Sequence, residues 1–132
     1  MARISSYQKN QANYTRARLP ELEVVDNHYK GRDYNIHFEI PEFNCVCPKT
    51  GLPDFATLVI DYVPDKKLVE LKSLKLYITA YRNLGIFHEH VANKVLDDLV
   101  KAVRPRRARL SADFNVRGGI HTVVTAAYRW KT

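Results

Sequence analysis

The sequence predicts an α+β domain in which a four-stranded antiparallel sheet carries two helices on one face. Three observations support this fold class. Apolar and polar residues alternate over residues 34–40 and 56–63, as in half-buried strands. Apolar residues then recur every three or four positions between residues 71 and 103, as in amphipathic helices. Alternation returns from residue 109 to 129, and the resulting order, ββααββ, is typical of an antiparallel sheet with both helices on one side.

A loop rich in turn-forming residues separates the first two strands. Residues 34–40 point apolar side chains one way and polar side chains the other, and Pro41 is expected to end this strand. Proline and glycine residues between positions 47 and 54 favour a loop. The second strand, "ATLVIDYV", covers residues 56–63 and is expected to end at Pro64.

Two helices are expected in the middle of the chain. The first should stop near Gly85, and four of its residues fall on one apolar face: Leu71, Leu74, Ile78 and Tyr81. The second begins at about Phe87, carries a broad apolar stripe, and ends at Pro105. Helices of this kind bury one face against a sheet.

The last two strands form a predicted hairpin, and the first residues form a predicted arm. Residues 109–116 and 120–129 alternate in polarity on either side of a turn at Gly118-Gly119. Residues 1–30 are polar and basic without a sustained period, so we expect an arm rather than a core element, followed by one domain over residues 31–132. Because the sheet has two edges and one uncovered face, we also expect association between copies of the chain.

The composition is that of a single soluble domain. The chain has 132 residues, 45% of them hydrophobic, which is enough for one core. No apolar run approaches the length of a membrane span, so we expect a cytoplasmic protein without a membrane partner. The net charge of +7 favours an anionic partner, such as nucleic acid or a phosphorylated cofactor, or serves solubility. The arginines between positions 104 and 109 fit a helix C-terminus better than an RNA-binding patch.

The segment "CVCPKTGLPDFA", residues 45–56, holds both cysteines of the chain. Cys45 and Cys47 are poorly placed to bridge each other, because the ring that they would close is strained. No second Cys or His pair stands at zinc-like spacing, so no metal is expected. Cys47 is a candidate nucleophile, since Lys49 and the amides of the turn would lower the pKa of its thiol; the alternative is a small buried side chain. Asp54 is a candidate proton donor or an ordinary turn residue.

Three further segments carry residues suited to ligand binding. In "ELKSLKLY", Lys72 and Lys75 form either a compact positive site for phosphates or a solvated helix face. In "FHEH", Glu89 is suited to accept two N–H donors from a guanine-like edge, or it complements the helix dipole. Its flanking histidines diverge on a helix, which weakens a shared metal site. In "VRGGI", Arg117 stands beside a glycine turn that permits close approach to phosphate, although such hairpins are common.

Four segments together resemble a known enzyme family. "CPKTGLPDFA", "ELKSLKLY", "YRNLGIFHEH" and "VRGGI" occur in this order and at these separations in the 7-cyano-7-deazaguanine reductases, the QueF nitrile reductases of queuosine biosynthesis. The resemblance runs from about Tyr34 to the early 120s. It implies a tunnel fold that assembles into barrel-like rings, with two stacked pentamers in the short subfamily. It also implies an NADPH-dependent, four-electron reduction of a nitrile to the amine of 7-aminomethyl-7-deazaguanine.

The resemblance also implies roles for individual residues. Cys47 matches the nucleophile that forms a covalent thioimide with the nitrile carbon, and Asp54 matches the acid that protonates the nitrile nitrogen. Glu89 matches the carboxylate that holds the deazaguanine edge, and His88 lines the same site as a further catalytic group. The remaining matches are Val69, Glu70 and Leu71 for substrate contact, and Lys72, Ser73, Lys75 and Arg117 for NADPH. Leu71 stands where the family has serine or leucine, so a hydroxyl contact is absent there.

Two other functions compete with the reductase. The QueF-like amidinotransferases share the fold and the Cys and Asp, but add ammonia to a nitrile already installed in tRNA. They lack the lysine-rich motif, so the intact "ELKSLKLY" favours the reductase, while the charge of +7 mildly favours the transferase. A basic RNA-binding module without enzymatic activity ranks far below, because no RNA-binding motif is recognisable. We therefore expect a small-molecule substrate, NADPH, and no direct contact with nucleic acid.

Overall fold

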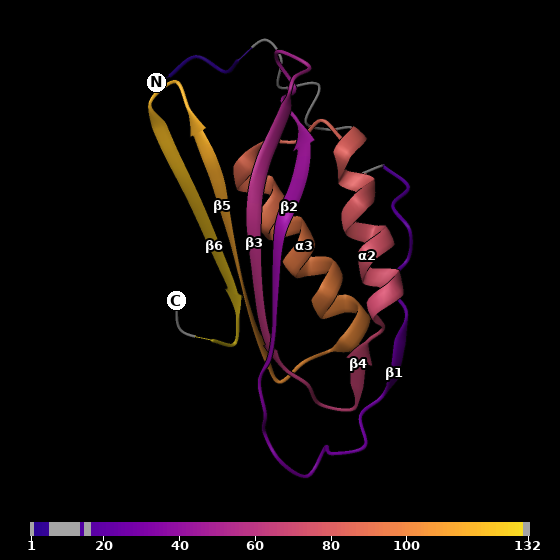
Figure 1. Cartoon of the computed structure of the whole chain (residues 1–132). Helices are drawn as coiled ribbons and strands as arrows, with labels where there is room; N and C mark the ends of the chain where they lie inside the picture. The colour runs from indigo at the N-terminus through magenta and orange to yellow at the C-terminus, as the bar shows by residue number, and fades with distance from the viewer. Residues whose placement is uncertain (1, 6–13, 15–16, 131–132) are drawn as a thin grey trace.

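The structure, a computed structural model, describes residues 2–5, 14 and 17–130. Its described part is an α+β fold with two antiparallel sheets (Figure 1). The elements in chain order are β1 (Val24–Asp26), β2 (Ile36–Val46), β3 (Pro53–Val63), β4 (Lys67–Val69), α2 (Leu71–Thr79), the 3-10 helix η2 (Ala80–Asn83), α3 (His88–Val103), β5 (Arg107–Arg117) and β6 (Ile120–Tyr128). No helix among the described residues is long and apolar enough to cross a membrane.

The larger sheet confirms the predicted ββααββ arrangement. Its strand order is β2-β3-β5-β6, and every neighbouring pair is antiparallel. Helix α3 crosses β5 and β6, while η2 lies against β2, so the helices cover one face of the sheet (Figure 1). Strand β6 starts after Gly118 and Gly119, which both have positive φ, as the predicted hairpin turn requires.

The core lies between this sheet and the two helices. Every second residue of β3 and β5 is buried on the helix side, because side chains alternate across a strand. The helices contribute one apolar stripe each. Of the face predicted for the first helix, Leu74, Ile78 and Tyr81 are buried, whereas the expectation for Leu71 is wrong: it stands in the first turn and is 62% exposed. The main buried residues are Leu58, Ile60, Leu110 and Ala112 of the sheet and Tyr77, Val91, Val95 and Leu99 of the helices.

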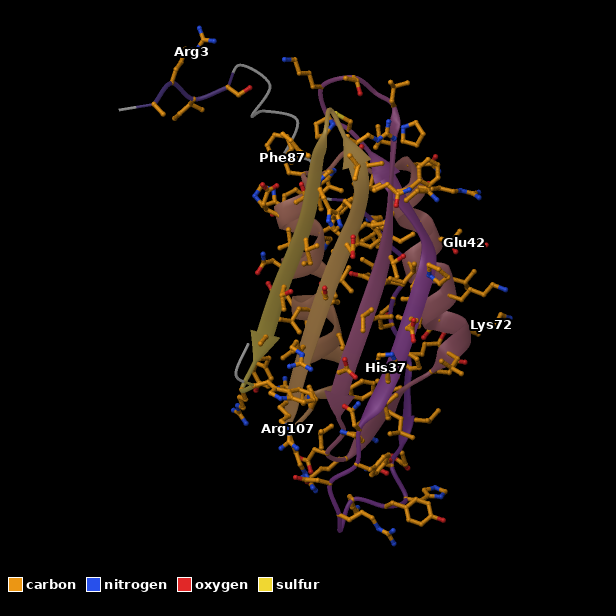
Figure 2. The ribbon with its side chains drawn as sticks, turned by 60° about the vertical axis from the view of Figure 1, so that its left-hand side comes forward. Arg3, His37, Glu42, Lys72, Phe87 and Arg107 are labelled. Carbon is orange, nitrogen blue, oxygen red and sulfur yellow. The ribbon has the colours of Figure 1, made fainter. Side chains whose placement is uncertain are left out.

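The opposite face of the sheet is mainly polar, and no helix among the described residues covers it. His37 is visible on this face in Figure 2, with the helices behind the strands. Its Nδ1 atom lies 2.8 Å from Oδ1 of Asp61, and its Nε2 atom lies 3.2 Å from Oε2 of Glu39. Asn35 donates a further hydrogen bond to Asp61. The alternation that predicted half-buried strands is therefore confirmed on both faces.

Strand β2 is longer than the sequence predicts. Pro41 was expected to end it, and this expectation is wrong: the strand continues to Val46. The register with β3 shifts between Ile40 and Phe43, and β2 is an edge strand, so the missing N–H of proline breaks no central ladder. Cys45 therefore lies within β2, where it pairs with Asp54 of β3. Strand β3 itself begins at Pro53, earlier than the sequence predicts.

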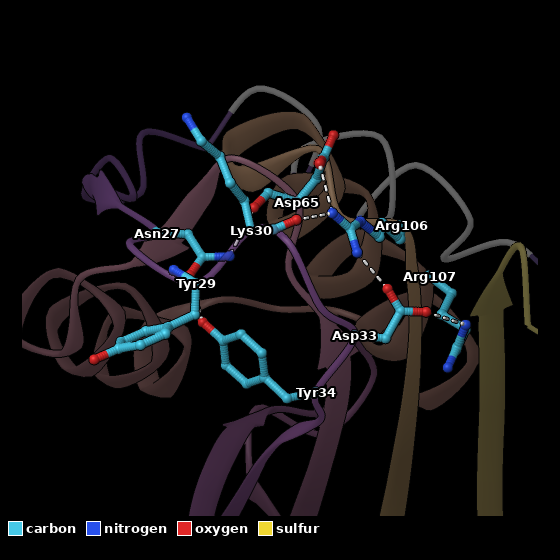
Figure 3. A network of polar contacts seen from close by, with 8 residues as sticks. All are labelled: Asn27, Tyr29, Lys30, Asp33, Tyr34, Asp65, Arg106 and Arg107. Atoms are coloured by element: carbon cyan, nitrogen blue, oxygen red, sulfur yellow. Dashed lines mark hydrogen bonds and ion pairs between the residues drawn. The ribbon is translucent and has the colours of Figure 1, made fainter.

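Part of the predicted N-terminal arm forms ordered structure. Strand β1 pairs with β4, and the adjoining Asn27 is 3% exposed. Asn27 donates from Nδ2 to the Asp65 carbonyl at 2.7 Å and accepts hydrogen bonds from the Tyr29 amide and the Tyr34 hydroxyl. Arg106 donates hydrogen bonds to the Asp33 carboxylate and the Lys30 carbonyl, in the segment that follows Asn27 (Figure 3). Residues 1, 6–13 and 15–16 of the predicted arm lie outside the described residues.

Candidate active site

The loop after β2 is closed by backbone hydrogen bonds at Cys47. The Cys47 amide donates to the Leu52 carbonyl at 2.8 Å, and the Gly51 amide donates to the Cys47 carbonyl at 2.9 Å. Gly51 has a φ of +73°, a conformation that favours glycine. The closed loop turns the amides of Lys49 and Thr50 back toward the thiol. The local sequence thereby places backbone donors around one sulfur atom.

These donors activate the Cys47 thiol. Burial raises its pKa, but hydrogen bonds from the Thr50 hydroxyl and from the amides of Thr50 and Lys49 outweigh burial, so the pKa lies below its ordinary value. The negative charge of Asp54 opposes this effect. A thiolate is the reactive form of cysteine, so Cys47 is suited to nucleophilic attack.

Cys45, two residues earlier, has the opposite environment. Its side chain is completely buried in the core. Burial, with smaller contributions from Asp54 and Cys47, raises the pKa of its thiol to about 12. Cys45 is therefore a neutral packing group near neutral pH.

Asp54 lies between an imidazole and a guanidinium. Its Oδ2 atom is 3.2 Å from Nε2 of His88, and its Oδ1 atom is 3.9 Å from Nε of Arg117. Its side chain is only 13% exposed. Arg117 also donates a hydrogen bond to the Pro53 carbonyl, which ties the end of β5 to the start of β3. The arrangement gives the carboxyl group one proton-exchanging neighbour and one fixed cation.

His88 and Glu89 begin helix α3 at the same end of the sheet. The His88 ring stacks on Phe114 of β5, with ring centroids 3.7 Å apart and planes 5° from parallel. Glu89 is exposed, and within the described part of the chain its side chain forms no ion pair. Its carboxylate is thus available to a ligand that approaches the start of α3. No spacing in the sequence indicated the contact of His88 with Phe114.

The predicted site residues of the segment Val69–Lys75 lie at the opposite end of the molecule from Cys47. Val69 donates its amide to the Tyr62 hydroxyl at 3.1 Å. Tyr62 stands eight residues along β3 from Asp54, which corresponds to about 27 Å in a strand. Figure 1 shows β4 and the start of α2 at one end, and the β2–β3 loop, the β5–β6 turn and the start of α3 at the other. One chain therefore does not bring its two groups of predicted site residues together.

Local hydrogen bonds organise the start of α2. The Glu70 carboxylate caps the helix by accepting from the amides of Lys72 at 2.7 Å and Ser73 at 2.8 Å, which lowers its pKa. The Ser73 hydroxyl donates to the Glu70 carbonyl and accepts from the Glu23 amide. Leu71 is 62% exposed. The predicted contact segment is thus a rigid helix start with an exposed leucine beside it.

The two lysines of this segment project from α2. Lys72, on the outer side of the molecule in Figure 2, and Lys75 are both exposed. Neither forms an ion pair with any residue that the structure describes. Within the same residues no group of three or more His, Cys, Asp or Glu side chains is placed to hold a metal ion. The free cations of this region are therefore suited to an anionic ligand.

Comparison with known proteins identifies the family. The family model described as QueF-like protein matches residues 53–132. A protein of Nitrosomonas eutropha named NADPH-dependent 7-cyano-7-deazaguanine reductase is 62% identical over 111 residues, which cover 84% of this chain and 80% of that protein. The chain belongs to the QueF family. A protein of Elusimicrobium minutum with the same name is 55% identical over 115 residues, covering 87% of this chain and 86% of its own length.

A solved structure supports the fold of this QueF family member. The apo form of an archaeosine synthase QueF-Like superposes with a TM-score of 0.68 and covers 74% of this chain and 96% of that one. Its sequence identity is 20%, so this likeness concerns the fold alone. The tunnel fold expected from the four motifs is confirmed, as is the resemblance to the reductase family.

Proposed function

We propose that this chain is an NADPH-dependent 7-cyano-7-deazaguanine reductase, which converts a nitrile to a primary amine with two NADPH in queuosine biosynthesis. The names of relatives with 62% and 55% identity support the activity. The observation that carries the chemistry is the thiol of Cys47, whose pKa is lowered, in the same site as the Asp54–His88 pair. A thiol nucleophile and a proton donor are the groups that nitrile activation requires.

The first chemical step uses Cys47 and Asp54. The Cys47 thiolate gives an electron pair to the nitrile carbon and forms a C–S bond. One π pair of the C≡N bond moves to nitrogen, which takes a proton from Asp54 and becomes the N–H of a thioimide. His88, 3.2 Å from Asp54, is placed to return a proton to the carboxylate. Covalent attachment holds the carbon in the site through the first reduction. The nitrogen lone pair then expels Cys47 as a thiolate and forms the C=N bond of an imine, and the second reduction converts this imine to the amine.

The exposed end of α2 fits the cofactor. NADPH, when bound, supplies the hydrides for the reduction. Lys72 and Lys75 carry exposed positive charges that form no ion pair among the described residues, which suits the phosphates of a dinucleotide. The Ser73 hydroxyl is used within the chain, so Ser73 holds this helix start in shape. Arg117 lies at the Cys47 end and would reach a cofactor from there.

The substrate is proposed to be held by its purine-like edge. The exposed Glu89 carboxylate, one residue from His88, is suited to accept the ring N–H and the exocyclic amine. Val69, Glu70 and Leu71 would contact the same molecule from a second copy of the chain, because in one copy they lie at the opposite end of the molecule from the start of α3 (Figure 1). Glu70 uses its carboxylate in the helix cap, so the exposed Leu71 side chain is the part that faces outward.

A homo-oligomer follows from this division of the site. Strands β2 and β6 are the two edges of the main sheet, and β6 contains no Lys, Arg, Asp, Glu or Pro to block pairing. We propose that these edges pair around a ring and that, in the assembly, the α2 start of one copy meets Cys47 of another. Two stacked pentamers in the cytoplasm, without membrane or nucleic acid, remain the proposed state.

Cofactor consumption tests the function. Purified protein should oxidise two NADPH for each free 7-cyano-7-deazaguanine consumed, as followed by nicotinamide absorbance. Cys47→Ala should abolish this consumption. If no NADPH is consumed and product appears only on nitrile-bearing tRNA in the presence of ammonia, the chain is an amidinotransferase and the reductase proposal is wrong.

A further inference from the structure

Two residues hold the imidazole ring of His88: Asp54 contacts the edge of the ring, and Phe114 packs against its face. Its Nε2 atom lies 3.2 Å from Oδ2 of Asp54, and its ring lies flat on Phe114 at a centroid distance of 3.7 Å. The two planes differ by 5°. Asp54 comes from β3 and Phe114 from β5, so two neighbouring strands define the position of one imidazole.

The Phe114 ring is itself fixed by the sheet. Phe114 is 1% exposed and pairs with Ala56 of β3 on one side and with Thr122 of β6 on the other. Ala56 is two residues from Asp54 on the same face of the same strand. The position of Phe114 relative to the carboxyl group is therefore set by the strand register, which is stiff.

The stacked ring restricts the one torsion that would disturb the Asp54–His88 contact. Rotation about χ2 of histidine is intrinsically broad. His88 is only partly buried at the start of α3, so burial alone leaves this torsion room. Against a parallel ring at 3.7 Å, turning the imidazole would drive its atoms into Phe114. The stack therefore keeps Nε2 directed at Asp54.

We propose that Phe114 is a positioning residue for the reaction, which acts through His88 and does not touch the substrate. This inference rests on the proposed function, in which His88 returns a proton to Asp54. Proton transfer needs a short, aligned contact between the two groups, and a displacement of about 1 Å can cost about a hundredfold in rate. Phe114 supplies the alignment, while Asp54 supplies the partner.

The test compares two phenylalanines of the same core. Phe114→Leu removes the flat face under His88, and Phe43→Leu is the matched control, because Phe43 is also 1% exposed but packs on Tyr81. Both variants should lose similar stability in urea. Only Phe114→Leu should lower kcat, by about tenfold or more, with KM for the nitrile unchanged. If Phe114→Leu does not fold, Phe114→Met carries the same expectation.

A second readout does not depend on activity. Diethyl pyrocarbonate labels histidine, and peptide mass spectrometry gives the labelling rate of His88 itself. This rate should rise severalfold in Phe114→Leu and stay at the wild-type value in Phe43→Leu. Equal kcat values in the two variants, or an unchanged His88 labelling rate in Phe114→Leu, would overturn the positioning role. If the wild-type protein does not reduce the nitrile, the proposed function has failed, and the labelling rate still decides whether Phe114 holds His88.

Discussion

Cys45 of β2 and Asp54 of β3 are directly paired in the antiparallel ladder, so Cys47 follows the pair by two residues. The strand register thus sets the position of the thiol loop relative to the acid. Cys45 faces the buried side of the sheet and its thiol lies inside the core, whereas the thiol of Cys47 is only partly buried. The two thiols therefore differ in their access to a substrate.

Substitution of the two cysteines should separate their roles. Cys47→Ala should lose the covalent adduct with 7-cyano-7-deazaguanine, because its thiol has the lowered pKa. Cys45→Ala should retain the adduct and lose about 1 kcal/mol of unfolding free energy, as for a typical core substitution. Intact mass spectrometry and urea denaturation measure the two effects. An adduct lost only in Cys45→Ala would reverse the assignment.

The hydroxyl of Thr50 should control the reactivity of Cys47. A lowered pKa means that more thiolate is present at a given pH below the ordinary value of about 8.5. Thr50→Val removes one donor to the sulfur, so the pKa should rise and the pH midpoint of iodoacetamide labelling should move upward. Thr50→Ser keeps the hydroxyl and should keep the wild-type midpoint. A midpoint that is equal in all three proteins would show that the backbone amides alone activate the thiol.

Mixed oligomers should show whether two copies build one site. Cys47→Ala and the double variant Lys72→Ala/Lys75→Ala should each be inactive, since they alter opposite ends of the chain. Co-refolding equal amounts of the two variants should restore NADPH oxidation to roughly a quarter of wild type. Each site needs an intact Cys47 from one copy and intact lysines from another, and each is present in half of the chains.

A pair of variants from one end provides the control for this mixture. Cys47→Ala mixed with Asp54→Asn should stay inactive, because both residues come from the same end of the same chain. Equal recovery in both mixtures, or in neither, would contradict the shared site.

His37 should make stability depend on pH. Hydrogen bonds that the His37 ring donates to the carboxylates of Asp61 and Glu39 raise the pKa of His37. A raised folded-state pKa adds stability below the unfolded value of about 6.5, and this stability is lost as pH rises through the folded value. The difference in unfolding free energy between wild type and His37→Gln should therefore be larger at pH 5.5 than at pH 8.5. A difference that is the same at both pH values in chemical denaturation would exclude this contribution.

Asn27 should be a major determinant of stability outside the main core. Asn27→Ala would leave the Asp65 carbonyl and the Tyr34 hydroxyl without their partner (Figure 3). Loss of such buried hydrogen bonds should cost about 2 kcal/mol of unfolding free energy. The exposed Asn115→Ala on β5 serves as the matched control and should change it by less than about 0.5 kcal/mol. Equal effects in urea denaturation would show that the Asn27 contacts are not stabilising.

Much of the fold was predictable from local patterns. The period of two over residues 56–63 and 109–116 and the spacing of three and four from Leu71 identified β3, β5 and α2, because these periods follow from backbone geometry. The strand through Pro41 was not predicted, since a proline is tolerated only where the strand lies at an edge with a shifted register. Strands β1 and β4 were missed because three-residue strands have no readable period.

The sequence by itself determined the order of the four main strands and two helices, because their periods follow from local backbone geometry. It also determined the family, because the four motifs and their separations do not depend on the folded arrangement. It could name Cys47, Asp54 and His88, but not their contacts. Only the tertiary structure decided that His88 meets Asp54 and stacks on Phe114, and that the Val69–Lys75 segment lies at the opposite end. These relations depend on strand register and helix packing between residues far apart in the chain, and no local pattern encodes them.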